Sequence, residues 1–392
     1  MTESTSKGNS ETADQSESAA VMAAPAIEAP LAILAELTHR CSFQCPYCSN
    51  PLEMEKKEKE LDTKTWCRVI DEAVEMGMHQ IHFSGGEPTL RDDLEQLVEH
   101  ATQAGLYCNL ITASSPRLDE DRLRRLGELG LEHVQLSFDD VEAENANRIG
   151  GAKGGHERKL LTAAWVKACG LPLTVNAVMH RQNIHHIKEM IDMAVELGAA
   201  RLEVAQVQYY GWALKNRAAF IPTPAQLDKT TKIVEEARER LKGKLVIDYV
   251  IPDYYAKRPK VCMGGWGRRF VNISPSGLAL PCHAAETIPE LEFDSVKDHS
   301  LAWIWENSPA FQRFRGTDWM PDPCRSCDRK EIDWGGCRCQ AYALTGDAAN
   351  TDPACELSPF HEKIFGMAEK EAEEEAPEFI YRRFGVTFNT PH

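Results

Sequence analysis

Short apolar runs alternate with longer amphipathic stretches between residues 31 and 250. The apolar runs occupy residues 31–37, 80–83, 107–112, 133–138, 173–178 and 201–207, and short runs of this kind are typical of parallel strands buried on both faces. Helical spacing follows each of the first five, at residues 65–76, 94–104, 121–129, 159–168 and 187–197. Glycines stand where left-handed helix caps are expected, at Gly77, Gly105, Gly130, Gly170 and Gly198. Six βα units in succession predict an α/β fold whose parallel sheet curls into a partial (β/α)6 barrel.

The alternation stops after residue 250, and the composition changes with it. Residues 251–360 are dense in Cys, Pro, Gly and Trp, whereas residues 361–392 return to a charged helical composition. Residues 1–30 are rich in Ser, Thr, Glu and Ala, which predicts a disordered tail. We therefore expect a TIM-like barrel over residues 31–250, a cysteine-rich domain over residues 251–360, and a C-terminal helical segment over residues 361–392.

Charge and hydropathy exclude two classes of partner. No apolar run approaches the roughly 20 residues that cross a bilayer, and no secretory signal is apparent. More than half of the net charge of −16 comes from residues 1–30 and 365–378, so the middle of the chain is only mildly acidic and lacks the basic surface of a nucleic-acid-binding protein. Thirteen cysteines without an export signal predict a cytoplasmic protein that uses its thiols as metal ligands.

Cys41, Cys45 and Cys48 stand within eight residues of each other. Iron–sulfur clusters are normally held by four cysteines, so a close trio can hold three irons of a four-iron cluster and leave the fourth open. An open position is also the mark of a catalytic metal site. Zinc is the alternative, but the Cys-x3-Cys-x2-Cys spacing matches no common zinc pattern.

A glycine-rich segment, Gly85-Gly86-Glu87-Pro88, follows the second predicted strand. Ligands of α/β barrels bind at the carboxyl ends of the strands, which places this segment beside the cysteine trio. The two glycines leave the backbone open to a ligand, and Glu87 can accept hydrogen bonds from an ammonium group. A plain turn is the alternative interpretation of the segment.

Together the cysteine trio, the aromatic Tyr47 before its last cysteine, and the Gly-Gly-Glu-Pro segment resemble the radical S-adenosylmethionine (SAM) superfamily. The resemblance implies an oxidoreductase in which Cys41, Cys45 and Cys48 hold a [4Fe–4S] cluster whose open iron binds SAM. It implies further SAM contacts from residues at matching positions: Tyr47 at the adenine, Gly85, Gly86, Glu87 and Pro88 at the amino group, and Ser137, Asp139, Arg148 and Asn176 at the ribose or carboxylate. The alternatives are packing under the loop for Tyr47 and an ordinary surface position for Arg148.

The cysteine-rich segment resembles the SPASM extension of radical SAM enzymes that modify ribosomal peptides. The resemblance implies two auxiliary iron–sulfur clusters, [4Fe–4S] or [2Fe–2S], and departs from the usual pattern at Asp333, where most SPASM proteins have cysteine, and at the extra Cys339. It assigns Cys262, Cys282, Cys337 and Cys339 to auxiliary cluster I, and Cys324, Cys327, Asp333 and Cys355 to auxiliary cluster II. A carboxylate is a harder ligand than a thiolate, so Asp333 should change the potential of its cluster. A polar turn for Asp333 and a zinc ribbon for Cys324 and Cys327 are the alternatives.

Eight further residues receive structural interpretations. Cys67, Cys108 and Cys169 lie in predicted helices or a strand and are expected to be small buried residues. The residues that follow the sixth strand either line a peptide channel or pack in the interior: Gln206, Gln208, Tyr209, Tyr210 and Trp212.

Over about residues 31–365 the chain resembles the peptide cyclases of pyrroloquinoline quinone (PQQ) biosynthesis. The resemblance rests on the unusual residues at 333–339 and on the segments at residues 45–51 and 208–213. That family joins a glutamate side-chain carbon to a tyrosine ring carbon in the precursor peptide PqqA, an early step toward the quinone. The resemblance implies a 5′-deoxyadenosyl radical made from SAM, and auxiliary clusters that carry away one electron. It also implies a leader-binding chaperone, PqqD, and a reductant such as flavodoxin, since a first strand near Leu31 leaves no room for a leader-binding module.

Two other functions compete with this interpretation. Another SPASM enzyme, such as a sulfatase maturase or a different peptide cross-linker, would share the trio and most downstream cysteines, but Asp333 and the Cys337/Cys339 pair count against it. A non-catalytic electron carrier has no use for an open-iron trio beside a SAM-type glycine segment. Formation of 5′-deoxyadenosine from SAM separates the carrier from the enzymes.

Overall fold

The computed structural model describes residues 27–382. Within them one sheet has the strand order β7-β6-β5-β4-β3-β2-β1-β8-β9, and every pair is parallel except β8 with β9. The strands are β1 (Ala32–Thr38), β2 (Gln80–Gly85), β3 (Tyr107–Thr112), β4 (Leu131–Phe138), β5 (Leu173–Met179), β6 (Arg201–Gln206), β7 (Val246–Tyr249), β8 (Phe270–Ile273) and β9 (Ala279–Leu280). The first six are the predicted strands, so the partial barrel is confirmed.

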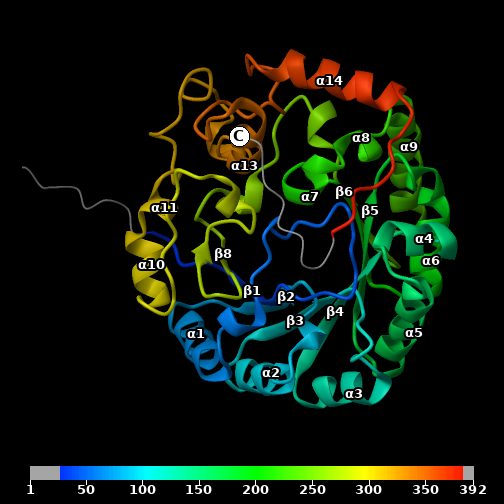
Figure 1. Ribbon diagram of the computed structural model, residues 1–392, viewed down its shortest axis with the longest axis vertical. Helices are drawn as coiled ribbons and strands as arrows, with labels where there is room; N and C mark the ends of the chain where they lie inside the picture. Colours follow the sequence, from blue (N-terminus) through cyan, green and yellow to red (C-terminus); the bar gives the residue numbers. More distant parts are fainter. Residues whose placement is uncertain (1–26, 383–392) are drawn as a thin grey trace, which may run out of the picture.

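Helices cover the outer side of this curved sheet, and the inner side stays open (Figure 1). They are α1 (Thr63–Glu75), α2 (Leu94–Gln103), α3 (Glu120–Glu128), α4 (Ala143–Gly150), α5 (Gly155–Ala168) and α6 (Ile187–Glu196). All five predicted helices are present, and the glycines at 77, 105, 130, 170 and 198 have positive φ angles, as predicted for left-handed caps. The added helix is α4, which ends at Gly151 with φ 59°.

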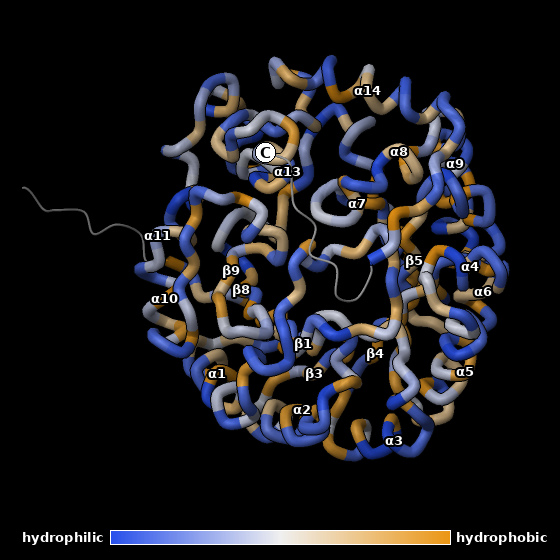
Figure 2. The backbone as a smooth tube through the Cα atoms, in the orientation of Figure 1, coloured by the Kyte–Doolittle hydropathy of each residue, from blue (hydrophilic) through white to orange (hydrophobic). Residues whose placement is uncertain are grey.

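The helices are placed by their apolar faces and their caps. Asp62 and Asp119 accept hydrogen bonds from the first turns of α1 and α3, as N-cap residues do. Alternate strand residues such as Ile33, Phe83 and Val175 pack against the helices in one continuous core. Figure 2 shows apolar and polar positions mixed along the strands, because the face toward the helices is apolar while the inner face carries polar side chains such as Gln135 and Asn176.

After β6 the chain crosses the open side of the barrel. It forms α7 (Gly211–Lys215), α8 (Arg217–Phe220) and α9 (Pro224–Arg240) before β7. The cysteine-rich part then contains β8, β9, α10 (Leu301–Asn307), α11 (Pro309–Gln312), α12 (Lys330–Asp333) and α13 (Arg338–Thr345). β8 pairs in parallel with β1, so this part of the chain continues the sheet of the barrel.

Short 3-10 helices and a C-terminal helix complete the described chain. The 3-10 helices are η1 (Lys57–Lys59), η2 (Pro88–Leu90), η3 (Ile184–His186), η4 (Asp253–Tyr255), η5 (Cys262–Gly264) and η6 (Ala285–Thr287). The predicted terminal helix is α14 (His361–Glu373). Most of the tail predicted at residues 1–30 lies outside the described residues. None of the described helices is both long and apolar enough to span a membrane.

Candidate active site and auxiliary cluster sites

The cysteine trio lies in the loop that follows β1, which we call the cysteine loop (residues 39–50). A hydrogen bond from Cys48 N to Cys45 O at 3.0 Å closes a turn within the loop, and one from Gln44 N to Gly150 O at 2.9 Å joins the loop to the end of α4. Burial, together with nearby Glu87, raises the pKa of Cys41 to about 12. Burial beside Asp139 raises the pKa of Cys45 well above its usual value. Cys48 contributes to the raised pKa of Cys41, and both Cys41 and Cys48 contribute to that of Cys45, so the three side chains lie near one another.

The raised pKa values describe the protein without a metal. A bound cation reverses that preference, because a coordinated thiol is deprotonated outright. No three His, Cys, Asp or Glu side chains within residues 27–382 are arranged around a single metal ion. Three clustered thiols in a half-buried loop are instead a donor set that suits a polynuclear cluster.

Gly85 and Gly86 are required by the cysteine loop itself. A Cβ on Gly85 would overlap the carbonyl oxygen of Thr38, and a Cβ on Gly86 would overlap that of Arg40. The backbone of the segment is bonded to the same loop, through Gly86 N to Thr38 O at 2.6 Å and Glu87 N to Arg40 O at 2.8 Å. The sequence analysis explained these glycines by the approach of a ligand. The structure gives a different reason, the close approach of two backbone segments.

Glu87 is fully buried, and its carboxylate already has protein partners. It accepts hydrogen bonds from Thr112 Oγ1 at 2.7 and 2.9 Å, from Ala113 N at 2.9 Å, and from Thr89 Oγ1 and N at 2.5 and 3.2 Å. Burial raises the pKa of Glu87, while these bonds oppose the rise. The side chain therefore ties η2 to the end of β3, with Pro88 buried at the start of η2.

Asp139 links the cysteine loop to the helical layer. Its carboxylate accepts from the Tyr47 hydroxyl and forms an ion pair with Lys159, and the side chains of Asp139 and Lys159 are both 2% exposed. The Lys159 ammonium also lies 4.6 Å from the centre of the Phe43 ring, in the cysteine loop. The predicted residues Tyr47 and Asp139 thus meet beside Cys45. Lys159, which sequence reasoning missed, balances the buried charge of Asp139.

Ser137 and Asn176 are register partners on β4 and β5. Asn176 Nδ2 donates to Glu203 Oε2 at 3.3 Å, so this pair lies on the polar inner face of the barrel. Arg148 is placed differently. Its guanidinium donates to Asn145 Oδ1 and Gln182 Oε1 at 2.7 and 2.6 Å and lies over the Phe379 ring. The Arg148 side chain is therefore exposed but bound to other protein groups.

His180 and Phe220 complete the surroundings of Tyr47. The Tyr47 ring centre lies 6.1 Å from that of His180 and 6.0 Å from that of Phe220. Burial, with a smaller contribution from Arg148, lowers the pKa of His180 to about 3. The imidazole is therefore neutral at ordinary pH and acts as an aromatic wall. Sequence reasoning missed it, because a histidine after a strand carries no distinctive signal.

The four cysteines assigned to auxiliary cluster I form a closed ring of neighbouring thiols. Cys262 interacts with Cys282 and Cys337, and Cys339 interacts with the same two residues. Proton sharing within the ring lowers the pKa of Cys282 and raises that of Cys337 to about 12. Cys282 and Cys339 are buried, so the ring is a preformed four-thiol donor set of the kind that holds an iron–sulfur cluster.

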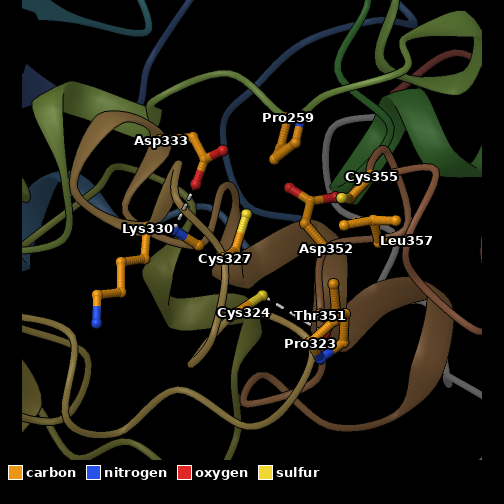
Figure 3. Close-up of a pocket in the computed structure, with 11 residues that line it drawn as sticks. Pro259, Pro323, Cys324, Cys327, Lys330, Asp333, Thr351, Asp352, Cys355 and Leu357 are labelled. Atoms are coloured by element: carbon orange, nitrogen blue, oxygen red, sulfur yellow. Dashed lines mark hydrogen bonds between the residues drawn. The ribbon is translucent and has the colours of Figure 1, made fainter.

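The four residues assigned to auxiliary cluster II line one pocket (Figure 3). The pocket holds about 330 Å³, part of it open to solvent, and Cys324, Cys327, Asp333 and Cys355 are among its walls. Cys324 Sγ lies 3.5 Å from Thr351 Oγ1, and Cys355 Sγ lies 3.7 Å from the Arg258 guanidinium. Three thiols and a carboxylate therefore line one cavity.

Two carboxylates face this pocket, and their partners distinguish them. Asp352 is fully engaged, since it accepts from Cys337 N at 2.6 Å, Ala354 N at 2.9 Å and Gln340 Nε2 at 3.0 Å. Asp333 accepts one bond, from Gly335 N at 3.2 Å, and has Arg329 at 3.6 Å. Asp333 is therefore the carboxylate with free lone pairs for a metal.

The remaining predicted residues divide into buried and accessible side chains. Tyr209, Tyr210 and Trp212 are buried, and only Gln208 of that group is exposed, so packing outweighs channel lining there. Tyr209 stacks on Tyr254 with ring centres 4.6 Å apart.

Among the three structural cysteines, Cys108 is buried as predicted, whereas Cys67 and Cys169 are half-buried at the edge of the core and the prediction was wrong for them.

Comparison with known proteins decides the family. Residues 35–194 match the radical SAM superfamily, and residues 262–328 match the SPASM iron–sulfur cluster-binding domain. A PqqA peptide cyclase of Bradyrhizobium diazoefficiens is 63% identical over 91% of this chain and 93% of its own length. The chain belongs to the PqqA peptide cyclase family. Another member, from Granulibacter bethesdensis, is 60% identical over 92% of this chain and 96% of its own.

Two solved structures share the fold of this PqqA peptide cyclase family member. Streptococcus suis SuiB bound to S-adenosylmethionine aligns with a TM-score of 0.68 and 19% identity, covering 84% of this chain and 78% of SuiB. The structure titled anSMEcpe with bound AdoMet aligns with a TM-score of 0.61 and 17% identity, over 88% of this chain and 95% of its own. These matches confirm the predicted fold. As a member of this family the chain is a radical SAM enzyme that uses a SAM-binding [4Fe–4S] cluster and auxiliary iron–sulfur clusters.

Proposed function

We propose that this chain joins a glutamate side-chain carbon to a tyrosine ring carbon of the precursor peptide PqqA, an early step of PQQ biosynthesis. The observation that carries the proposal is 63% identity to a PqqA peptide cyclase over nearly the whole of both chains. The clustering of Asp333 with three cysteines supports it, because that carboxylate distinguishes this chain from the usual SPASM pattern.

We assign the ligands as the sequence analysis did. Cys41, Cys45 and Cys48 would hold the SAM cluster, the four-thiol ring would hold auxiliary cluster I, and the pocket with Asp333 would hold auxiliary cluster II. When bound, the SAM cluster and SAM supply a 5′-deoxyadenosyl radical, while the auxiliary clusters supply an acceptor for one electron. The SAM contacts remain proposals for Tyr47, Ser137, Asp139, Arg148, Asn176 and the Gly85–Pro88 segment.

The protein residues position and shield this chemistry. Glu87 and the two glycines fix the cysteine loop against β1 and β2. Asp139 and Lys159 hold Tyr47 and Phe43 on its other side. The neutral His180 and the Phe220 ring keep water away from that side of the loop. A fixed, dry wall of this kind protects a reactive intermediate from side reactions.

The partners and the compartment follow from the same family relation. We propose PqqA as the substrate, PqqD as the leader-binding chaperone and a flavodoxin-type protein as the reductant. We also propose a cytoplasmic location, because all thirteen cysteines are free thiols and the ten of them assigned as ligands need a reducing compartment during cluster assembly.

Mass spectrometry of the product peptide tests the proposal. The reconstituted enzyme is incubated without oxygen with SAM, a reductant, PqqD and PqqA. We expect a loss of two hydrogens that fragmentation localises to a Glu–Tyr pair. An enzyme that cleaves SAM but leaves PqqA unchanged would contradict the substrate and favour another SPASM maturase.

A further inference from the structure

The last described residues return from α14 to the cysteine loop. We call residues 377–382 the C-terminal strap. In Figure 1 it is the red segment that leaves α14 and runs down into the open side of the barrel. None of the residues that sequence reasoning assigned to the active site lies in this strap.

The main chain of the strap is bonded to the cysteine loop through one side chain. Asn216 Oδ1 accepts from Ile380 N at 2.7 Å, and Asn216 Nδ2 donates to Ile380 O at 3.0 Å. The same Nδ2 lies 3.1 Å from Pro46 O, between Cys45 and Cys48. The strap and the loop are thus held on one buried amide, which leaves little freedom for either to move alone.

Arg382 makes the most direct contact with the trio. Its side chain is 6% exposed, and Nη2 donates to Phe43 O at 2.6 Å. Nη1 lies 4.0 Å from Cys48 Sγ and 3.7 Å from Met54 Sδ. A guanidinium is rarely buried without a structural reason, and here it holds a carbonyl of the loop while its charge faces the thiol of a proposed ligand.

Aromatic residues of the strap close the wall on the side of Tyr47. The Phe379 ring stacks on Phe220 with centres 5.2 Å apart, and the Arg148 guanidinium lies 4.7 Å from the Phe379 centre. The Tyr381 hydroxyl donates to Arg148 O at 2.6 Å. Residues 379–382 of the strap are therefore in contact with residues that surround the trio.

We propose that the C-terminal strap is a wall of the SAM-cluster site and that Arg382 is a positioning residue for the cysteine loop. Arg382 holds the Phe43 carbonyl, which keeps the loop in the conformation that presents Cys41, Cys45 and Cys48 together. The guanidinium charge also lies beside the thiol of Cys48. The proposal rests on the proposed function only in taking the trio as the SAM-cluster ligands.

The first test uses the cluster-free protein. Hydrogen–deuterium exchange of the peptide covering residues 41–50 is compared in wild type, Arg382→Gln and the control Lys370→Gln, which removes an exposed charge from α14. We expect roughly tenfold faster exchange in Arg382→Gln, the effect of losing one charge-assisted hydrogen bond, and no change in the control. Exchange in β5 serves as an internal check that the barrel stays folded. Unchanged exchange at residues 41–50 would overturn the proposal.

The second test measures the SAM cluster after anaerobic reconstitution. We expect Arg382→Gln to lose iron from the SAM site, seen as a smaller SAM-induced shift in the electron paramagnetic resonance (EPR) spectrum, with auxiliary signals unchanged. Arg382→Lys keeps the charge and should retain more SAM-site iron than Arg382→Gln. A SAM-site spectrum equal to wild type in Arg382→Gln would contradict the positioning role. Neither readout uses PqqA, so the role of Arg382 can be tested even if the enzyme fails to cross-link the peptide.

Discussion

At the scale of single residues, the carboxylates and the histidine of the site owe their properties to burial and to their partners. Two carboxylates line the auxiliary cluster II pocket, but only Asp333 lacks a full set of protein donors. The sequence predicted Asp333 by its place in the cysteine pattern, whereas Asp352 could not be found because its role depends on the fold. Asp352 is a bridge: its side chain accepts from Cys337 N, and its carbonyl accepts from Cys355 N at 2.9 Å.

The first prediction concerns Asp333. Asp333→Ala removes a proposed ligand, so we expect the EPR signal of one auxiliary cluster to change while the SAM-cluster signal stays. Asp333→Cys should restore a four-ligand cluster with an altered potential, since thiolate is the softer ligand. The exposed Asp318→Ala is the matched control. Auxiliary spectra that stay identical in Asp333→Ala would show that this residue is no ligand.

The second prediction concerns pH. The pKa of His180 falls from 6.5 to about 3 on folding, so the unfolded chain binds the extra proton between those values. The contribution of the neutral His180 to the free energy of unfolding is therefore fully present above about pH 6.5, and it is lost as the pH falls toward 3. By pH 5 the loss attributable to His180 should reach about 2 kcal/mol.

Urea unfolding of the cluster-free protein at pH 7, 6 and 5 measures this decline. His180→Phe removes the titrating group and should lower the decline by about 2 kcal/mol, while the exposed control His79→Gln should not. An equal decline in wild type and His180→Phe would show that this histidine is not the source.

At the scale of elements, the sequence predicted what local pattern determines. Continuous apolar runs placed β1 to β6 within two residues at nearly every end, and glycines at helix ends marked the caps. β8 and β9 escaped prediction because they are short strands in a cysteine-rich segment without periodicity. The C-terminal strap escaped because it is held by tertiary contacts alone. The sequence identified Gly85 and Gly86 as special positions, but the reason that glycine is needed there became visible only in the fold.

The third prediction tests that reason. In Gly86→Ala the new Cβ would overlap the Arg40 carbonyl, and relief requires movement of the backbone. We expect the free energy of unfolding to fall by roughly 1–3 kcal/mol, measured by urea titration. Gly366→Ala in α14, where a Cβ meets nothing within 4 Å, is the control and should gain about 0.5–1 kcal/mol. A neutral Gly86→Ala would contradict tight packing between the two segments.

At the scale of the whole molecule, one sheet joins the radical-generating end to the auxiliary clusters. β8 pairs with β1, the strand that leads into the cysteine loop. The Tyr210 side chain, in the segment after β6, packs among the thiols of auxiliary cluster I. The sequence could predict the two halves, and it supplied the ligand assignments that we propose. It could not predict this junction, because pairing between distant strands depends on the packing of the complete fold.

The central claim is that the Cys41–Cys48 site starts the chemistry on a glutamate of PqqA. The most direct measurement uses PqqA with deuterium on the glutamate side-chain carbons, incubated with the reconstituted enzyme, SAM, PqqD and reductant. We predict that mass spectrometry finds deuterium in 5′-deoxyadenosine and a Glu–Tyr cross-link in the peptide. A cross-linked peptide accompanied by 5′-deoxyadenosine without deuterium would contradict the account.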